Sequence, residues 1–76
     1  MPNEEWNMTS VASSQIDQIG FNPATNQGRA LFLKNQALYE YDGCTQSEAD
    51  EIINAPSVGQ AFGAIWKGVK GYRRIS

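Results

Sequence analysis

The last part of the chain carries side chains that could bind a phosphate group. All eight acidic residues lie within residues 1–54, whereas residues 55–76 contain four cations and no acid. These cations alternate with aromatic residues, and the candidate binding set is Trp66, Lys67, Lys70, Tyr72, Arg73 and Arg74. Arginine holds phosphate through paired hydrogen bonds, and an aromatic ring stacks on a nucleobase. If the helix continued past Gly71, then Lys67, Lys70 and Arg74 would line one helical face.

The same residues also have a purely structural interpretation. Cations near the C-terminal end of a helix offset its dipole without any ligand. Trp66 belongs to the apolar stripe of a helix and is favoured as a core residue over a stacking platform. Tyr39 and Tyr41 share one face of a strand, where they could stack on bases or support a helix, and the core interpretation is favoured.

Ser57, Val58 and Gly59 form a second candidate anion site. Free amides at a helix N-terminus attract anions, and Gly59 would let a phosphate approach the backbone. A capping box between Ser57 and Gln60 explains the same residues without a ligand, and this explanation is favoured.

Catalytic residue types are scarce. The chain has no histidine and a single cysteine, so a Cys–His nucleophile is excluded and Cys44 is expected to be a small apolar filler. Asp17, Glu40 and Asp42 could form a carboxylate pair or a magnesium site, but carboxylates near strand ends are expected to be solvated. We therefore expect no enzyme, no cofactor and no metal.

Composition limits the class of protein. The 76 residues, of which 41% are hydrophobic, predict one small folded domain. Neither a transmembrane helix nor a secretory signal is expected, and one free thiol favours a reducing cytoplasm. The net charge of −2 disfavours non-specific binding to long nucleic acid.

The hydrophobic pattern predicts an α+β fold, with a three-stranded antiparallel meander followed by two helices. The strands are expected at residues 11–21, with a bulge near Asp17, at 29–34 and at 37–41. A turn is expected at residues 35–36. One helix should run from a Thr45/Glu48 capping box to about residue 54, with Cys44 and Ala49 at the staple positions.

The second helix should begin at Ser57 and bury an apolar stripe that extends to Val69. Residues 72–75 are either a frayed tail or a short fourth strand. Residues 1–8 are expected to be a flexible tail in which Trp6 packs on its own domain, on another subunit or on a ligand, and residues 9–76 form the domain.

Several short motifs resemble the KTSC domain, which is found at the C-terminus of some lysyl-tRNA synthetases and as a stand-alone bacterial or phage protein. They are Val11-Ala-Ser-Ser14, Ile19-Gly-Phe21, Leu31-Phe-Leu33, Leu38-Tyr-Glu-Tyr41, Ala55-Pro-Ser57-Val-Gly59, Ile65-Trp-Lys67 and Tyr72. The similarity spans residues 9–75 and implies a small α+β domain. Gln36 stands where the family usually has a glycine, and Gly43-Cys44 replaces the usual Val-Pro.

Three functions are compatible with these features. The favoured one is a non-enzymatic binder that sequesters a small nucleotide-type anion in the host cytoplasm, like phage proteins with an anti-defence role. An RNA-binding accessory module and a protein-interaction module with an exposed sheet face are the alternatives. The middle strand is apolar on both sides, which favours a homo-oligomer, most simply a dimer.

Overall fold

The computed structural model describes residues 7–75. In chain order the elements are β1 (Asn7–Ser10), β2 (Ile16–Asn22), β3 (Gln27–Phe32), β4 (Leu38–Asp42), α1 (Gln46–Ile53), α2 (Val58–Ile65) and β5 (Tyr72–Arg74). The predicted α+β fold, an antiparallel sheet followed by two helices, is confirmed. Of the two alternatives for the residues after Gly71, the short strand is the one that forms, as β5.

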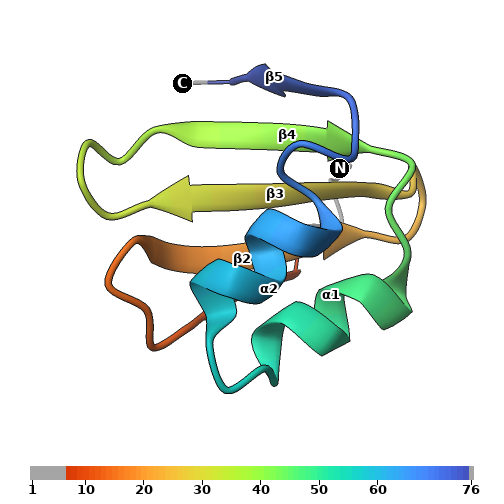
Figure 1. Cartoon of the computed structure of the whole chain (residues 1–76). Coiled ribbons are helices and arrows are strands. Elements are labelled where there is room, and N and C mark those ends of the chain that lie inside the picture. The colour runs from red at the N-terminus through yellow and green to blue at the C-terminus, as the bar shows by residue number, and fades with distance from the viewer. Residues whose placement is uncertain (1–6, 76) are drawn as a thin grey trace.

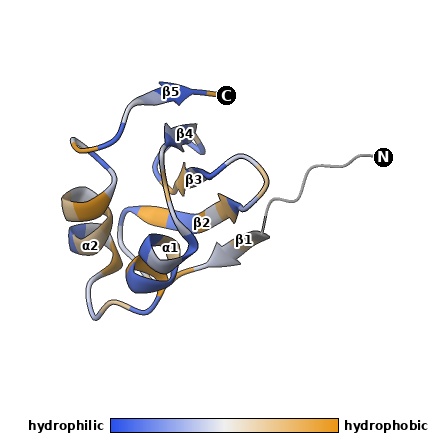
Figure 2. Ribbon diagram, turned by 90° about the vertical axis from the view of Figure 1, so that its right-hand side faces the viewer, coloured by the Kyte–Doolittle hydropathy of each residue, from blue (hydrophilic) through white to orange (hydrophobic). Residues whose placement is uncertain are grey.

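The five strands form one antiparallel sheet in the order β1-β2-β3-β4-β5 (Figure 1). Strands β1 to β4 follow one another directly, because their short connections allow only antiparallel neighbours. The chain then forms both helices and returns to place β5 beside β4. Both helices lie on one side of the sheet, and no helix of residues 7–75 covers the other side, which we call the helix-free face (Figure 2).

The first part of the sheet differs from the prediction of one strand over residues 11–21. The chain leaves the sheet at residues 11–15, so that β1 and β2 are separate strands. The four residues of β1, NMTS, show no alternation of apolar and polar types, and no strand is expected there from sequence. β1 begins inside the segment expected to be a tail, and the rest of that segment, Trp6 included, lies outside the described residues.

The predicted irregularity in β2 is confirmed. The pairing of β2 with β3 shifts register between Ile16 and Gln18, which is the bulge expected near Asp17. A turn connects β3 to β4 as predicted, but β3 ends at Phe32, so this turn also contains residues 33 and 34, which were expected in the strand. At the β3–β4 turn the amide of Phe32 donates to the carbonyl of Ala37 at 3.0 Å, and Gln36 has a φ of 55°. This left-handed conformation suits glycine, the residue that the family resemblance expects at this position.

Capping explains where the helices begin. The Thr45 hydroxyl accepts from the Glu48 amide, and the Glu48 carboxylate accepts from the Thr45 amide, each at 3.1 Å, so the predicted capping box is confirmed. Cys44 and Ala49, at the staple positions, are both buried. At α2 the Ser57 hydroxyl accepts from the Gln60 amide at 3.4 Å, which is the serine half of the second predicted box.

The prediction that the apolar stripe of α2 extends to Val69 is wrong. α2 ends at Ile65, and Gly68 takes a φ of 81°, a left-handed conformation that terminates helices. Val69 therefore lies outside the helix and is 64% exposed. Within residues 7–75, no helix has the length and apolar character needed to cross a lipid bilayer.

Trp66 lies at the centre of the core, between α2 and the sheet. Its side chain is fully buried, stacks with the ring of Tyr41 at a centroid distance of 6.0 Å and meets Phe62 edge-on at 6.5 Å. The expectation that Trp66 is a core residue is confirmed. The fully buried aliphatic residues around it are Ile16, Ile19, Ala30 and Ile52.

Candidate functional site

An aromatic cleft opens where the sheet meets the segment that follows α2. Its volume is about 360 Å³. β3, β4, β5 and the loop after α2 supply its lining, which consists of Phe32, Tyr39, Tyr41, Lys67, Gly68 and Tyr72. We call it the aromatic cleft. Two of the residues predicted as ligand-binding, Lys67 and Tyr72, are brought together here.

The three tyrosines of the cleft are placed by strand geometry. Alternate side chains of a strand point to the same face, so Tyr39 and Tyr41 of β4 both face the helices. β5 pairs with β4 so that Tyr72 lies opposite Tyr41. The Tyr72 ring lies 5.9 Å from that of Tyr39 and 5.8 Å from that of Tyr41, yet 62% of Tyr72 remains exposed. This exposed ring can stack on a planar ligand.

Tyr41 is the most buried residue of the cleft lining. It is 2% exposed and packs between Trp66 and the edge of Phe62, whose ring centroid is 5.4 Å away. Burial raises the pKa of the Tyr41 phenol to about 12, and the neighbouring Tyr39 and Tyr72 act in the same direction. The hydroxyl therefore stays protonated at physiological pH. Tyr41 is thus both a core residue and part of the cleft, which unites the two interpretations that the sequence left open.

Lys67 supplies the positive charge of the aromatic cleft. It is exposed and follows the last turn of α2, where its amide still donates to the carbonyl of Phe62. No carboxylate of the described residues forms an ion pair with it. An ammonium group at this position is available to an anion without first breaking an internal contact.

Ser57, Val58 and Gly59 line a different cleft, at the start of α2. It has a volume of about 440 Å³ and is completed by Ala12, Ser13, Ser14, Gln15, Pro56 and Gln60. We call it the serine cleft. The Ser57 hydroxyl caps α2, and the Ser13 hydroxyl accepts from the amides of Gln15 and Ile16 at 3.1 and 3.3 Å. Two of its polar groups thus already serve the local backbone.

Lys70 is held by an internal contact. Its ammonium group forms an ion pair with Glu48 at 3.2 Å and donates to the carbonyl of Gly43 at 2.8 Å. Burial disfavours ionised Glu48, but hydrogen bonds from Lys70, the Thr45 amide and the Trp66 indole outweigh this effect and lower its pKa. Lys70 thus ties the loop after α2 to the start of α1.

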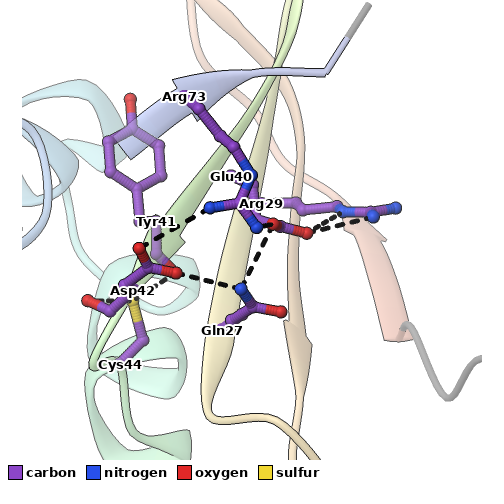
Figure 3. Close-up of polar contacts among 7 residues, drawn as sticks. All are labelled: Gln27, Arg29, Glu40, Tyr41, Asp42, Cys44 and Arg73. Carbon is purple, nitrogen blue, oxygen red and sulfur yellow. Dashed lines mark hydrogen bonds and ion pairs between the residues drawn. The ribbon is translucent and has the colours of Figure 1, made fainter. Parts of the chain in front are cut away.

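Arg73 lies on the helix-free face. Its guanidinium forms ion pairs with Glu40 and, at 3.7 Å, with Asp42. Arg29 contacts the other oxygen of Glu40 at 3.1 Å, and Gln27 donates to both carboxylates. Figure 3 shows both arginines converging on Glu40 while the ring of Tyr41 lies on the other side of β4. Glu40 is only 4% exposed, so the expectation that these strand-end carboxylates are solvated is wrong for Glu40.

The predicted alignment of Lys67, Lys70 and Arg74 on one helical face is wrong. α2 ends before all three, and Arg74 belongs to β5, where its backbone pairs with Tyr39. Because strand side chains alternate, Arg74 shares the face of Tyr72, whereas Arg73 points to the opposite face. The basic end of the chain is therefore divided between the two sides of the sheet.

Metal ligation and cysteine chemistry have little support among the described residues. No group of three or more potential metal ligands occurs within residues 7–75. Cys44 is buried, and burial raises the pKa of its thiol to about 11, so the nucleophilic thiolate is scarce at neutral pH. The chemistry available in the aromatic cleft is stacking, hydrogen bonding and attraction of negative charge.

One cleft residue, Phe32, was not expected from the sequence to bind a ligand. Phe32 is one of three consecutive apolar residues, and nothing in the sequence distinguishes it from Leu31 and Leu33 as a ligand-binding residue. Gly68 was expected inside the second helix, where its cost to the helix suggested close packing, close approach of a ligand or a C-cap. Gly68 becomes part of the lining because α2 ends early. A glycine just after the last turn is a known signal for the end of a helix, but it does not show which surface the following loop covers.

Comparison with known proteins identifies the fold. The family model of the KTSC domain matches residues 12–69. A crystal structure of a KTSC domain protein from Yersinia pestis superposes with a TM-score of 0.85 and 27% sequence identity, over 93% of this chain and 99% of that one. No curated protein matches the chain.

Proposed function

The chain belongs to the KTSC domain family, and from this premise we propose that it is a non-enzymatic protein that binds a nucleotide-type anion in the aromatic cleft. The observation that carries the proposal is that three tyrosines surround one opening together with Lys67, which pairs with no carboxylate of residues 7–75. Tyr72 offers an exposed ring for a base, and Lys67 offers charge for a phosphate.

The size of the aromatic cleft favours a small ligand. Pockets for small molecules span about 300–1,000 Å³, and the cleft, at about 360 Å³, lies near the lower limit. A mononucleotide is a better match than a long single strand, which needs a continuous basic groove. In this chain the basic residues are divided, because Arg73 and Lys70 are engaged by Glu40 and Glu48.

One role open to a binder that does not transform its ligand is to hold that ligand out of solution. We therefore infer sequestration in the cytoplasm as the role, comparable to that of phage proteins that blunt nucleotide-based immune signals. RNA binding and protein binding are the alternative functions if the test below finds no nucleotide.

The first experiment looks for a carried ligand and for ligand binding by the purified protein. The protein is denatured, and released nucleotides are identified by mass spectrometry and ultraviolet absorbance. Thermal shifts are then measured with AMP, GMP, cyclic AMP and ADP-ribose. We expect a rise in melting temperature with at least one of them, because a ligand that binds only the folded state stabilises it.

Matched variants locate the site. Tyr72→Ala and Lys67→Ala should each reduce the shift, whereas Lys34→Ala, which removes the same charge from the β3–β4 turn, should leave it unchanged. No released nucleotide and no shift with any of the four compounds would overturn the proposal. Equal losses in Lys67→Ala and Lys34→Ala would show that general charge, and not the aromatic cleft, is responsible.

A further inference from the structure

The hydroxyl of Tyr41 has no hydrogen-bond partner in the described part of the chain. This is unusual, because Tyr41 is 98% buried and buried polar groups are nearly always paired. Every fully buried side-chain nitrogen or oxygen within residues 7–75 does have a partner. The Tyr41 hydroxyl must therefore keep a small opening to solvent, and Tyr41 lines the aromatic cleft.

The rest of the Tyr41 side chain is fixed. Its ring is held between Trp66 and Phe62, and its backbone belongs to β4, which has a paired strand on each side. Because the ring is already held in place, the position of the Tyr41 hydroxyl is fixed before a ligand binds. Binding to it therefore costs little conformational entropy. The opposite side of the strand is equally constrained, because Glu40 is held there by Arg29 and Arg73.

A ligand that fills the aromatic cleft displaces solvent from the Tyr41 hydroxyl. It must then accept a hydrogen bond from this group, since leaving a buried donor unpaired costs about 1–3 kcal/mol. The hydroxyl remains protonated at physiological pH because the pKa of Tyr41 is raised to about 12, so it is a donor under all such conditions. A purely apolar ring would fit the shape of the cleft but would carry this penalty.

We propose that Tyr41 determines the specificity of the aromatic cleft by donating a hydrogen bond to an acceptor on the edge of a planar heteroaromatic ring. In this arrangement Tyr72 stacks on the face of the ring and Lys67 contacts the phosphate. The inference rests on the proposed function, because it assigns to Tyr41 the recognition of the base in the same cleft.

The test removes only the hydroxyl. Affinities of the wild-type protein and of Tyr41→Phe are measured by calorimetry with AMP, GMP, CMP and UMP, and with ribose 5-phosphate, which lacks a base. We expect Tyr41→Phe to weaken the best-bound nucleotide about five- to tenfold, the loss of one hydrogen bond. Binding of ribose 5-phosphate should not change. The melting temperature should also stay the same, because the hydroxyl has no partner within the described residues.

Tyr72→Phe is the matched control, since it removes a hydroxyl from a neighbouring ring that is largely exposed. It should change nucleotide affinity by less than twofold. Unchanged affinity in Tyr41→Phe, an equal loss in Tyr72→Phe, or a melting temperature lowered by several degrees in Tyr41→Phe would each overturn the inference. The proposed function fails separately, when the wild-type protein releases no nucleotide and binds none of these four nucleotides, cyclic AMP or ADP-ribose, so the two failures are distinguishable.

Discussion

Gly28 allows Trp66 to reach the sheet. A Cβ atom at Gly28 would lie 2.4–2.8 Å from three atoms of the Trp66 six-membered ring, well inside van der Waals contact. Position 28 faces the helices, as its pairing opposite Tyr41 shows. The absence of a side chain there is therefore a packing requirement, which connects one residue of β3 to the centre of the core.

Gly28→Ala should destabilise the protein by about 2–3 kcal/mol, because overpacking forces Trp66 out of its position. Chemical denaturation followed by tryptophan fluorescence measures the change. Gly63→Ala is the matched control. Position 63 lies in α2, and a Cβ added there would meet nothing within 4 Å beyond its chain neighbours and the backbone of its own helix. Alanine at this position should therefore stabilise the protein by up to about 1 kcal/mol. Equal effects of the two substitutions would contradict the packing argument.

Gln36 is strained in a way that glycine would relieve. Its φ of 55° costs a residue with a side chain about 1–2 kcal/mol, and its own side chain makes only a long bond, 3.4 Å, to the carbonyl of Phe32. Gln36→Gly should therefore stabilise the protein by about 0.5–1 kcal/mol, after the extra entropy of glycine in the unfolded chain is subtracted. Thermal unfolding measures the gain. Gln36→Ala retains the strain, and a gain of the same size in that variant would refute the explanation.

At the scale of elements, β5 is the weakest strand of the sheet. It has three residues, all exposed, and pairs only with β4. It contributes to both faces, because Tyr72 lines the aromatic cleft while Arg73 contacts Glu40 on the helix-free face. The ion pair on one side of the sheet thus holds a wall of the cleft on the other side.

Arg73→Ala should loosen β5 and weaken ligand binding in the cleft. The Arg73 side chain is half exposed, so its contacts with Glu40 contribute about 1 kcal/mol, which corresponds to about fivefold faster hydrogen exchange of the β5 amides. The Asp42 amide donates to the carbonyl of Gly71, and the Ile75 amide donates to the carbonyl of Leu38. Exchange of these two amides should therefore measure the detachment of β5 from β4. Lys67→Ala should leave exchange unchanged. Unaltered exchange in Arg73→Ala would show that the ion pair of Arg73 with Glu40 does not hold β5 in place.

Elements defined by neighbouring residues are predictable from this sequence, whereas the arrangement of its basic end is not. The capping box of α1 and the β3–β4 turn depend on contacts within five residues. Trp66, the C-cap of α2, packs on Gly28, a contact across the fold that neighbouring residues in the sequence do not indicate. Because α2 ends early, the basic residues after it lie in three different places: Lys67 at the aromatic cleft, Lys70 beside Glu48, and Arg73 beside Glu40. Their spacing in the sequence therefore does not predict which of them lie close together.

At the scale of the whole molecule, Glu48 and Lys70 connect the helical layer to the last segment of the chain. The lowered pKa of Glu48 means that ionised Glu48 stabilises the fold. This contribution is complete above the unfolded pKa of about 4.3 and disappears as the pH falls through the lowered native value. Denaturation at several pH values should therefore show stability falling below about pH 4.5. In Glu48→Gln this part of the fall should be absent, and an unchanged acid profile would contradict the assignment.

The helix-free face predicts a homodimer. A chain of 76 residues buries a small core, and Leu31 and Leu38, directly paired across β3 and β4, lie on this face without a covering helix. Glu40 and Asp42 alternate with Arg29 and Arg73 beside them, so two copies related by a twofold axis could bring opposite charges together.

Light scattering should accordingly give twice the mass of the chain, with a mass that falls on dilution. Leu38→Glu places a charge in the paired apolar positions and should yield a monomer. Val69→Glu, the matched control, adds the same charge at an exposed position outside the sheet and should remain a dimer. A wild-type monomer at millimolar concentration would show that solvent, and not a second copy, covers Leu31 and Leu38. The ion pairs around Glu40 would then stabilise β5 alone.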